Sequence, residues 1–186
     1  DVVSLDIGSQ PELDSVPGAR EYATPVKPVA GLWRRWQDMC ERLTARGIDE
    51  DFRIAVVGGG AGSVELVLAM ASRLKGKPGR FDLWCAASEI LPGHGARARR
   101  SVMSQLRRWD IQVHCNARIT AVAGGDLTFA DGRQDVYDEL FWCTGAAPAP
   151  WIAASGLTTD ERGFLAVRDT LQAMQDDCIF GTGDIA

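Results

Sequence analysis

Apolar and polar residues alternate with two different periods along this chain, and the changes of period predict its elements. Apolar residues at three- and four-residue spacings predict an amphipathic helix over residues 30–46, ended by Gly47. Short apolar runs and helical patterns then alternate. They predict strands at 53–57, 81–85 and 111–115, and helices at 63–75 and 96–109. This order favours parallel strands joined by crossover helices.

The pattern changes after residue 115. Short strand-like runs, separated by glycines at 124–125 and by Asp131–Gly132, predict a small antiparallel meander. Its last run, 137–145, is placed to rejoin the sheet. Apolar runs near both ends predict one short strand each, at 2–8 and 178–186, beside loop-rich segments. The predicted fold class is α/β: a Rossmann-like three-layer β/α domain with a small antiparallel meander.

Composition and charge narrow the possible function classes. The 186 residues are 46% hydrophobic and 24% charged, as in ordinary globular proteins. The net charge of -5 argues against nucleic acid as a partner. One basic cluster, residues 97–108, lies in a predicted helix, where it forms either a solvated face or a phosphate-binding group. No apolar run reaches the ~18–20 residues of a membrane span, and the first residues do not resemble a signal peptide.

Five cysteines lie at least 28 residues apart, without CxxC or metal-ligand spacing, so neither a metal site nor a local dithiol is predicted. Cys85, Cys115 and Cys143 lie in apolar strand-like runs and are expected to be buried and inert. Such scattered free thiols favour a reducing compartment, the cytoplasm. His114 is expected to be structural, and His94 to be exposed in a loop. The chain has no initiator Met and opens inside a strand-like run, which predicts a fragment of a longer protein.

The main candidate chemistry lies in GGGAGS, residues 58–63. The stretch follows a predicted strand and begins a predicted helix, the context in which G-x-G-x-x-G indicates dinucleotide binding. Gly58 lets the strand turn sharply, and Gly60 lets the backbone approach a pyrophosphate at the helix N-terminus. Ser63 stands in place of the third glycine. A purely structural glycine turn is the competing interpretation.

The acid that usually binds the adenosine ribose is missing from the end of the next strand. That strand ends at Cys85, and the first acid beyond it is Glu89. Arg97 and Arg99 are candidates for binding a 2′-phosphate. The sequence therefore does not decide between NAD and NADP.

Several segments, in the right order, resemble one family. They are SLDIGSQP (4–11), PVKP (25–28), VVGGGAGSVELVLAM (56–70), LFWCTGAAPAPW (140–151) and IFGTGDIA (179–186). Together they are similar to segments of the FAD-dependent pyridine nucleotide-disulfide oxidoreductases, in the NADH dehydrogenase-like branch. LPGHGARARR, residues 91–100, resembles the reductase part that is found fused to selenide, water dikinase.

The resemblance implies that NAD(P)H passes hydride to FAD, after which electrons go to a quinone or another acceptor. It implies an NAD(P)H-binding domain at 29–146 and remnants of the FAD-binding domain at 1–28 and 147–186. The implied cofactor-binding residues are Gly58, Gly59, Gly60, Ala61, Gly62, Ser63, Glu65, Thr144 and Gly145 for the dinucleotide, and Gly183 and Asp184 for the flavin. No catalytic acid or base is implied, because the cofactors carry the hydride.

Simpler interpretations compete for single residues. Glu65 can instead be an acid near a helix N-terminus that interacts favourably with the helix dipole. Thr144 and Gly145 can simply form a turn at the end of a strand, and Asp184 can be a helix N-cap. Family segments expected before Asp1 and after Ala186 are missing, so the FAD site is expected to be incomplete and the fragment inactive alone.

Three functions compete for the whole chain. The first is part of a flavin-dependent NAD(P)H oxidoreductase, whose parent protein is either cytoplasmic or peripheral to a membrane. The second is a degenerate nucleotide-binding sensor or scaffold, motivated by Ser63 and the missing ribose acid. The third is an NAD-dependent dehydrogenase without flavin. Residues 180–184 argue against it, because a single Rossmann domain does not need this segment. Without a CxxC pair, the acceptor is expected to be reduced directly.

Overall fold

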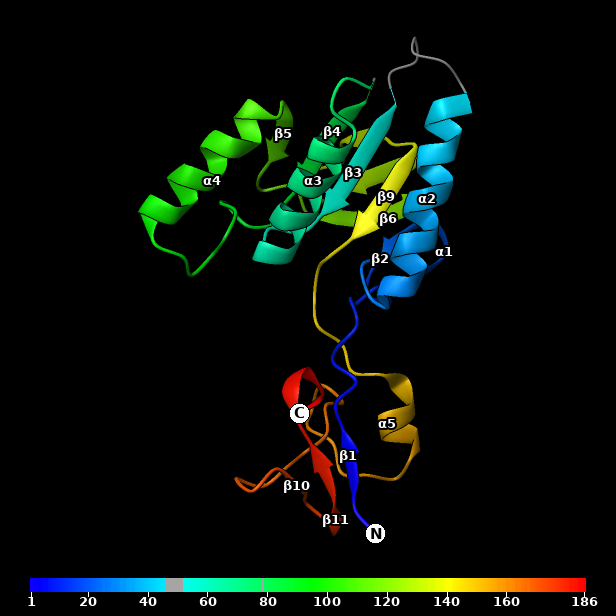
Figure 1. Cartoon of the computed structure of the whole chain (residues 1–186), viewed down its shortest axis with the longest axis vertical. Helices are drawn as coiled ribbons and strands as arrows, with labels where there is room; N and C mark the ends of the chain where they lie inside the picture. The colour runs from blue at the N-terminus through cyan, green and yellow to red at the C-terminus, as the bar shows by residue number, and fades with distance from the viewer. Residues whose placement is uncertain (46–51, 78) are drawn as a thin grey trace. The chain divides into compact units, whose positions relative to one another are not determined.

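The computed structural model describes residues 1–45, 52–77 and 79–186. They form two compact units, which are described separately: Leu13–Thr144, and Asp1–Glu12 together with Gly145–Ala186 (Figure 1). The expected end of the first long helix, at Arg46 and Gly47, falls outside the described residues.

A five-stranded parallel sheet forms the centre of the larger unit, in the order β2-β9-β3-β4-β5. Its strands are β2 (Thr24–Pro25), β3 (Arg53–Val57), β4 (Arg80–Trp84), β5 (Ile111–His114) and β9 (Glu139–Trp142). Val57 pairs with Trp84 on one side and with Trp142 on the other, and Trp84 pairs with His114. All these strands therefore end along one edge. The predicted parallel sheet is confirmed, as is the return of the last meander strand to it.

Three helices share a core with one face of this sheet, as Figure 1 shows: α2 (Val29–Ala45), α3 (Ala61–Arg73) and α4 (Ala96–Arg108). Met39, Val67 and Leu106, one from each helix, are fully buried in this core, which also contains Ile54 and Leu83 of the sheet. The 3.6-residue apolar period predicted these helices because each turns a single apolar face inward. Their described bounds differ from the predicted ones by at most two residues.

A three-stranded antiparallel sheet covers the opposite face. It contains β6 (Ile119–Ala123), β7 (Asp126–Phe129) and β8 (Gln134–Val136). Leu127 and Phe129 of the meander share a core with Trp84 and Trp142 of the parallel sheet. The unit therefore has three layers, and both the predicted meander and the predicted fold class are confirmed.

Ionic contacts hold α2 against β9. The Glu139 side chain is completely buried and accepts hydrogen bonds from Arg35, at 2.7 Å, and from Arg42. The two arginines are seven residues apart and therefore lie on one face of the helix. Since a buried carboxylate is stable only when paired, this triad fixes the position of α2 on the sheet.

The segment 9–28 belongs to the loop-rich sequence expected after the first short strand, but it is partly regular, so that prediction was wrong in detail. It contains α1 (Ala19–Tyr22) as well as β2. Ala19 is fully buried, and the Val122 N–H donates to the Pro17 carbonyl at 2.9 Å. A four-residue helix is too short to show a period, and contacts with the meander stabilise it.

The smaller unit contains a three-stranded sheet. In it β11 (Asp176–Gly181) lies between β1 (Val3–Leu5), which is parallel to it, and the antiparallel β10 (Gln172–Ala173). The strands predicted at the two ends of the chain thus pair with each other. The segment between, predicted to be loop-rich, also holds the short helix α5 (Pro150–Ala154), and a 3-10 turn, Gly183–Ile185, follows β11. Ile152, Leu165 and Ile185 form part of its core.

Candidate functional site

The candidate site begins where β3 ends in the glycine loop. Gly58 has φ 143°, and its N–H donates to the Trp84 carbonyl at 2.8 Å. A Cβ at Gly58 would lie 3.2 Å from the Cβ atoms of Cys143 and Ser63. A Cβ at Gly59 would lie 2.3 Å from Cys85 Sγ. Both glycines are therefore required by close packing at the end of the strand, and Gly58 also by its backbone conformation.

Gly60 faces open space at the N-terminus of α3. It has φ -84°, and no described heavy atom lies within 4 Å of a Cβ built there. The following residues, Ala61 and Gly62, are exposed, and the first turn has neither an acidic residue nor, among the described residues, a side-chain cap. Helix N–H groups that are uncapped and open on this side fit an anionic group such as a pyrophosphate.

Ser63 turns away from this opening. Its side chain is buried, and its hydroxyl donates to the Gly60 carbonyl at 2.8 Å. The third motif position therefore supports the loop from behind, packed against Gly58. Here the hydroxyl has a partner inside the loop, which is why a serine is accommodated where the motif usually has glycine.

Glu65 and Thr144 are the other two residues assigned to the dinucleotide in the larger unit. Glu65 is exposed, in the second turn of α3, beyond the first turn where a helix dipole is most effective. Thr144 is half-buried and follows β9, the strand next to β3. The Cys143 N–H donates to the Val57 carbonyl at 2.8 Å, so Thr144 is one residue from direct contact with the end of β3.

Beside Gly59, the end of β4 carries no acid. Cys85 is buried there, and its thiol lies 3.6 Å from the Glu89 carbonyl oxygen. The first acid after the strand, Glu89, forms an ion pair with Arg99 at 3.2 Å. The position of the carboxylate that would bind an adenosine ribose is therefore taken here by the thiol of Cys85.

A cavity of about 640 Å³ opens beyond β4 and β5, against α4. Its lining includes Glu89, Arg99, Arg100, Arg107 and Cys115. Part of the basic cluster thus faces a cavity, while Arg97 and Arg108 are exposed. Three guanidinium groups and a single carboxylate give this cavity a cationic lining that suits an anionic ligand.

His114 was expected to be structural, and its contacts lie within the larger unit. Its Nε2 lies 2.6 Å from Asp82 Oδ1, and its ring stacks on Trp84 with centroids 3.9 Å apart. Burial acts to raise the pKa of Asp82, but hydrogen bonds from His114 and Arg80 outweigh burial and leave that pKa below its usual value. The cluster joins β4 to β5 on the face that carries the meander.

In the smaller unit, Asp184 meets the other end of the chain. The Ser9 hydroxyl donates to an Asp184 carboxylate oxygen at 3.3 Å. Gly183 has φ 68°, and a Cβ there would lie 2.8 Å from Asp6 Oδ1. Gly145, at φ 69°, lies in the same unit, where a Cβ would be 2.7 Å from Glu12 Cβ. Segments far apart in the sequence thus converge on a glycine–aspartate turn.

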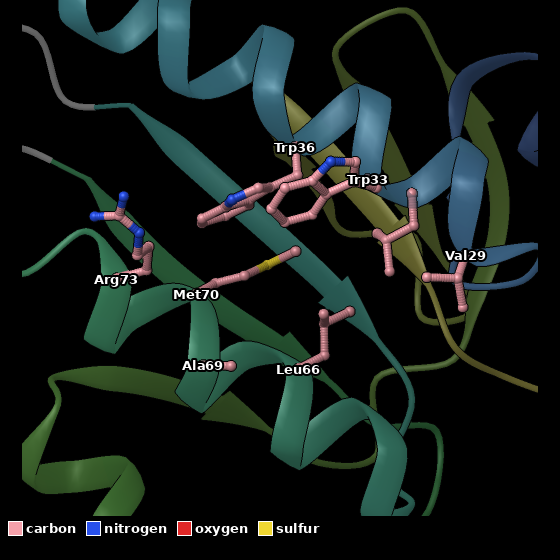
Figure 2. A pocket seen from close by; sticks show the side chains of 8 residues that line it. Val29, Trp33, Trp36, Leu66, Ala69, Met70 and Arg73 are labelled. Atoms are coloured by element: carbon pink, nitrogen blue, oxygen red, sulfur yellow. The ribbon is translucent and has the colours of Figure 1, made fainter.

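A second cavity, of about 280 Å³, lies between α2 and α3. Figure 2 shows Trp33 and Trp36 of α2 facing Leu66 and Met70 of α3, with Arg73 at one end. Trp33 is 57% exposed, so it is not a core residue, whereas Trp36 packs against the core.

The parallel sheet, its covering layers and the glycine loop are those of the Rossmann-type α/β class. Within that class, the chain belongs to the pyridine nucleotide-disulphide oxidoreductase family, whose model matches residues 6–186. In the described part of the chain, no helix has both the length and the apolarity needed to cross a membrane.

Named relatives agree with this family. The chain is 27% identical over 187 residues to demethylphylloquinone reductase NdbB of Synechocystis, covering 99% of this chain and 46% of that protein. It is 30% identical over 159 residues to the type II NADH:quinone oxidoreductase of Haemophilus influenzae, covering 78% of this chain and 36% of that one. The chain therefore spans less than half the length of these relatives. Its family includes flavin-dependent NADH oxidoreductases.

Solved structures show the same fold. The structure of NDH2 from Plasmodium falciparum in complex with NADH matches the whole chain with a TM-score of 0.82 and 18% identity, over 43% of that protein. A FAD-dependent pyridine nucleotide-disulphide oxidoreductase from Desulfovibrio vulgaris matches with a TM-score of 0.72 and 20% identity, over 46% of its length.

Proposed function

We propose that this chain is part of a flavin-dependent NAD(P)H oxidoreductase and that residues 58–65, with Thr144, bind the NAD(P)H. The observation that carries the proposal is the open, uncapped N-terminus of α3 behind Gly60. The backbone N–H groups of that turn bind the pyrophosphate, and Gly60 leaves room for its approach. The relatives named as NADH:quinone and demethylphylloquinone reductases support this choice.

The individual residues have different roles in this proposal. Gly58 and Gly59 hold the loop close to β9 and β4, and Ser63 supports it from behind. Ala61 and Gly62 present backbone N–H groups, while Glu65 and Thr144 flank the nicotinamide side. The protein's task is to bind and orient the dinucleotide and to exclude water from it. Hydride transfer itself is the chemistry that the nicotinamide and the flavin supply when both are bound.

In the smaller unit we propose a partial flavin site. Gly183 and Asp184 contact the flavin, and the Ser9 hydroxyl orients the Asp184 carboxylate. Family segments outside residues 1–186 complete this site in the parent protein, so the 186-residue chain binds FAD weakly. A quinone is the acceptor favoured by the named relatives. The selenide, water dikinase fusion stays a prediction, which sequencing of the parent gene tests.

The test is a titration of the chain with NADH and with NADPH, followed by calorimetry. Gly60→Glu places a charged side chain in the pyrophosphate's path and is expected to abolish saturable binding. Gly31→Glu is the matched control, since a Cβ at Gly31 of α2 also meets no described atom. Thermal unfolding of both variants checks that they are folded.

The same titration separates the proposal from its main alternative. Saturable binding by the native chain and by Gly31→Glu, but not by Gly60→Glu, supports the dinucleotide site. Absence of binding to either nucleotide at millimolar concentration refutes it. If the nucleotide binds but the full-length parent does not oxidise it with flavin present, the chain is a nucleotide-binding sensor. The presence of Cys85 in place of the ribose acid favours this alternative.

A further inference from the structure

The residues that directly follow four neighbouring strands form a row along the carboxyl edge of the sheet. They are, in sheet order, Cys143 after β9, Gly58 after β3, Cys85 after β4 and Cys115 after β5. The register places these positions side by side, because Val57, Trp84 and His114 pair directly before them. Three of the five cysteines therefore gather at one edge.

Cys85 and Cys115 are immediate neighbours in this row. The Cys85 N–H donates to the His114 carbonyl at 2.8 Å, and the Ala117 N–H donates to the Cys85 carbonyl at 2.9 Å. These two hydrogen bonds bracket Cys115. Adjacent strands lie about 4.7–4.9 Å apart, and disulfides join residues whose Cα atoms are about 4.4–6.8 Å apart. The spacing of the backbone therefore permits a disulfide here.

Access to the two thiols differs. Cys85 is buried against Gly59, whereas Cys115 is partly exposed and lines the cavity of about 640 Å³. Arg99, Arg100 and Arg107 line the same cavity, opposed by the single carboxylate of Glu89. A small anionic molecule is attracted to this lining and can reach the Cys115 sulfur, while Cys85 is not among the residues that line the cavity.

We propose that Cys85 and Cys115 form a disulfide by thiol–disulfide exchange with a small anionic disulfide of the glutathione type, bound in this cavity. The Cys115 thiolate attacks one sulfur of the small disulfide, forms a mixed disulfide and releases one small thiolate. The Cys85 thiolate then attacks the Cys115 sulfur and releases the second small thiolate. Two protein thiols are oxidised, one small disulfide is reduced to two thiols, and the two protein protons end on these thiols.

The other cysteines provide internal comparisons. Cys143 is separated from Cys85 by Gly58, so two strand spacings, about 9–10 Å, lie between them, beyond the reach of a disulfide. Burial raises the pKa of Cys143 to about 12, which keeps its thiol protonated. Cys178 is exposed and lies in the smaller unit. The proposal is independent of whether the glycine loop binds NAD(P)H.

The test treats the reduced chain with oxidised glutathione at about pH 7 and about pH 8.5, then blocks remaining thiols and maps peptides by mass spectrometry. Cys178→Ser serves as the background, because it removes the exposed cysteine. We expect the chain to lose the mass of two hydrogen atoms and to yield a peptide that joins Cys85 to Cys115. Burial and the neighbouring Cys85 raise the pKa of Cys115, so exchange is faster at the higher pH.

Variants separate the two steps. Cys85→Ser is expected to stop at a mixed disulfide between Cys115 and glutathione, and Cys115→Ser to leave Cys85 reduced. Arg100→Gln is expected to slow the reaction with glutathione disulfide several-fold but not that with neutral hydroxyethyl disulfide. The proposal is overturned if the background chain stays reduced at the higher pH, or if Cys115 pairs with any cysteine other than Cys85. Both observations use the chain without a substitution at the edge, so neither depends on how the variants fold.

Discussion

The buried ion triad between α2 and β9 makes a stability prediction that follows from geometry alone. Glu139→Gln keeps the size of the side chain but removes its charge. One amide oxygen can still accept a hydrogen bond from Arg35 or Arg42, while the amide nitrogen then faces the other guanidinium, donor against donor. The substitution therefore breaks one of two charge-assisted contacts and weakens the other.

The magnitude follows from burial. Breaking a fully buried ion pair costs about 3–5 kcal/mol. Glu139 is 0% exposed, but the side chains of Arg35 and Arg42 are 44% and 41% exposed, so water solvates the guanidinium groups when the contact is lost. We therefore expect Glu139→Gln to lower the free energy of unfolding by about 2–3 kcal/mol. In a unit of this size that is a fall in Tm of roughly 6–15 °C.

The assay is urea unfolding of the native chain and its variants, followed by far-UV circular dichroism. Glu41→Gln, at an exposed position of the same helix, is the control and is expected to change the unfolding free energy by less than about 0.5 kcal/mol. A Glu139→Gln variant as stable as the control would refute the reasoning, as would a double-mutant cycle with Arg35→Ala that gives no coupling. Glu139 begins β9, whereas the glycine loop lies at the other end of the sheet, so nucleotide affinity should not change.

Two further predictions concern the site and its support. Gly58→Ala is expected to lower the unfolding free energy by about 1–3 kcal/mol, because Gly58 has φ 143° and the new Cβ would have contacts of 3.2 Å. Gly60→Ala is the control and should be nearly neutral, because a Cβ there meets no described atom. Equal effects of the two substitutions in urea unfolding would contradict this. The lowered pKa of Asp82 stabilises the fold above the carboxyl's ordinary pKa and ceases to do so as the pH falls through the lowered one. Asp82→Asn should therefore be less stable than the native chain at pH 7, with a difference that shrinks towards pH 3; a difference independent of pH would argue against the His114 and Arg80 contacts as its cause.

Local pattern was sufficient for the three long helices of the larger unit and for its strands from β3 onwards. The bounds of β3 were predicted to the residue, because a short apolar run ends in glycines that no helix tolerates well. The short elements α1, β2, α5 and β10 were missed. Each has only two to five residues, too few to show a period, and each is held by contacts with distant segments.

The candidate site divides in the same way. The glycines could be predicted because they respond to local backbone demands. The inward turn of the Ser63 hydroxyl and the Ser9–Asp184 hydrogen bond could not, since they depend on which strands are neighbours. The role of Glu139 was missed as well, because a single acid in an apolar strand gives no sign of the two arginines that pair with it.

What the sequence determined by itself is the order of elements, the parallel sheet and the glycine loop, all of which follow from residue periods and from the conformational freedom of glycine. What only the tertiary structure decided is which side chains meet. Cys85 and Cys115 are 30 residues apart in the chain, and no spacing rule joins them. They become neighbours because parallel strands in register align the residues that follow them, and register is a property of the assembled sheet.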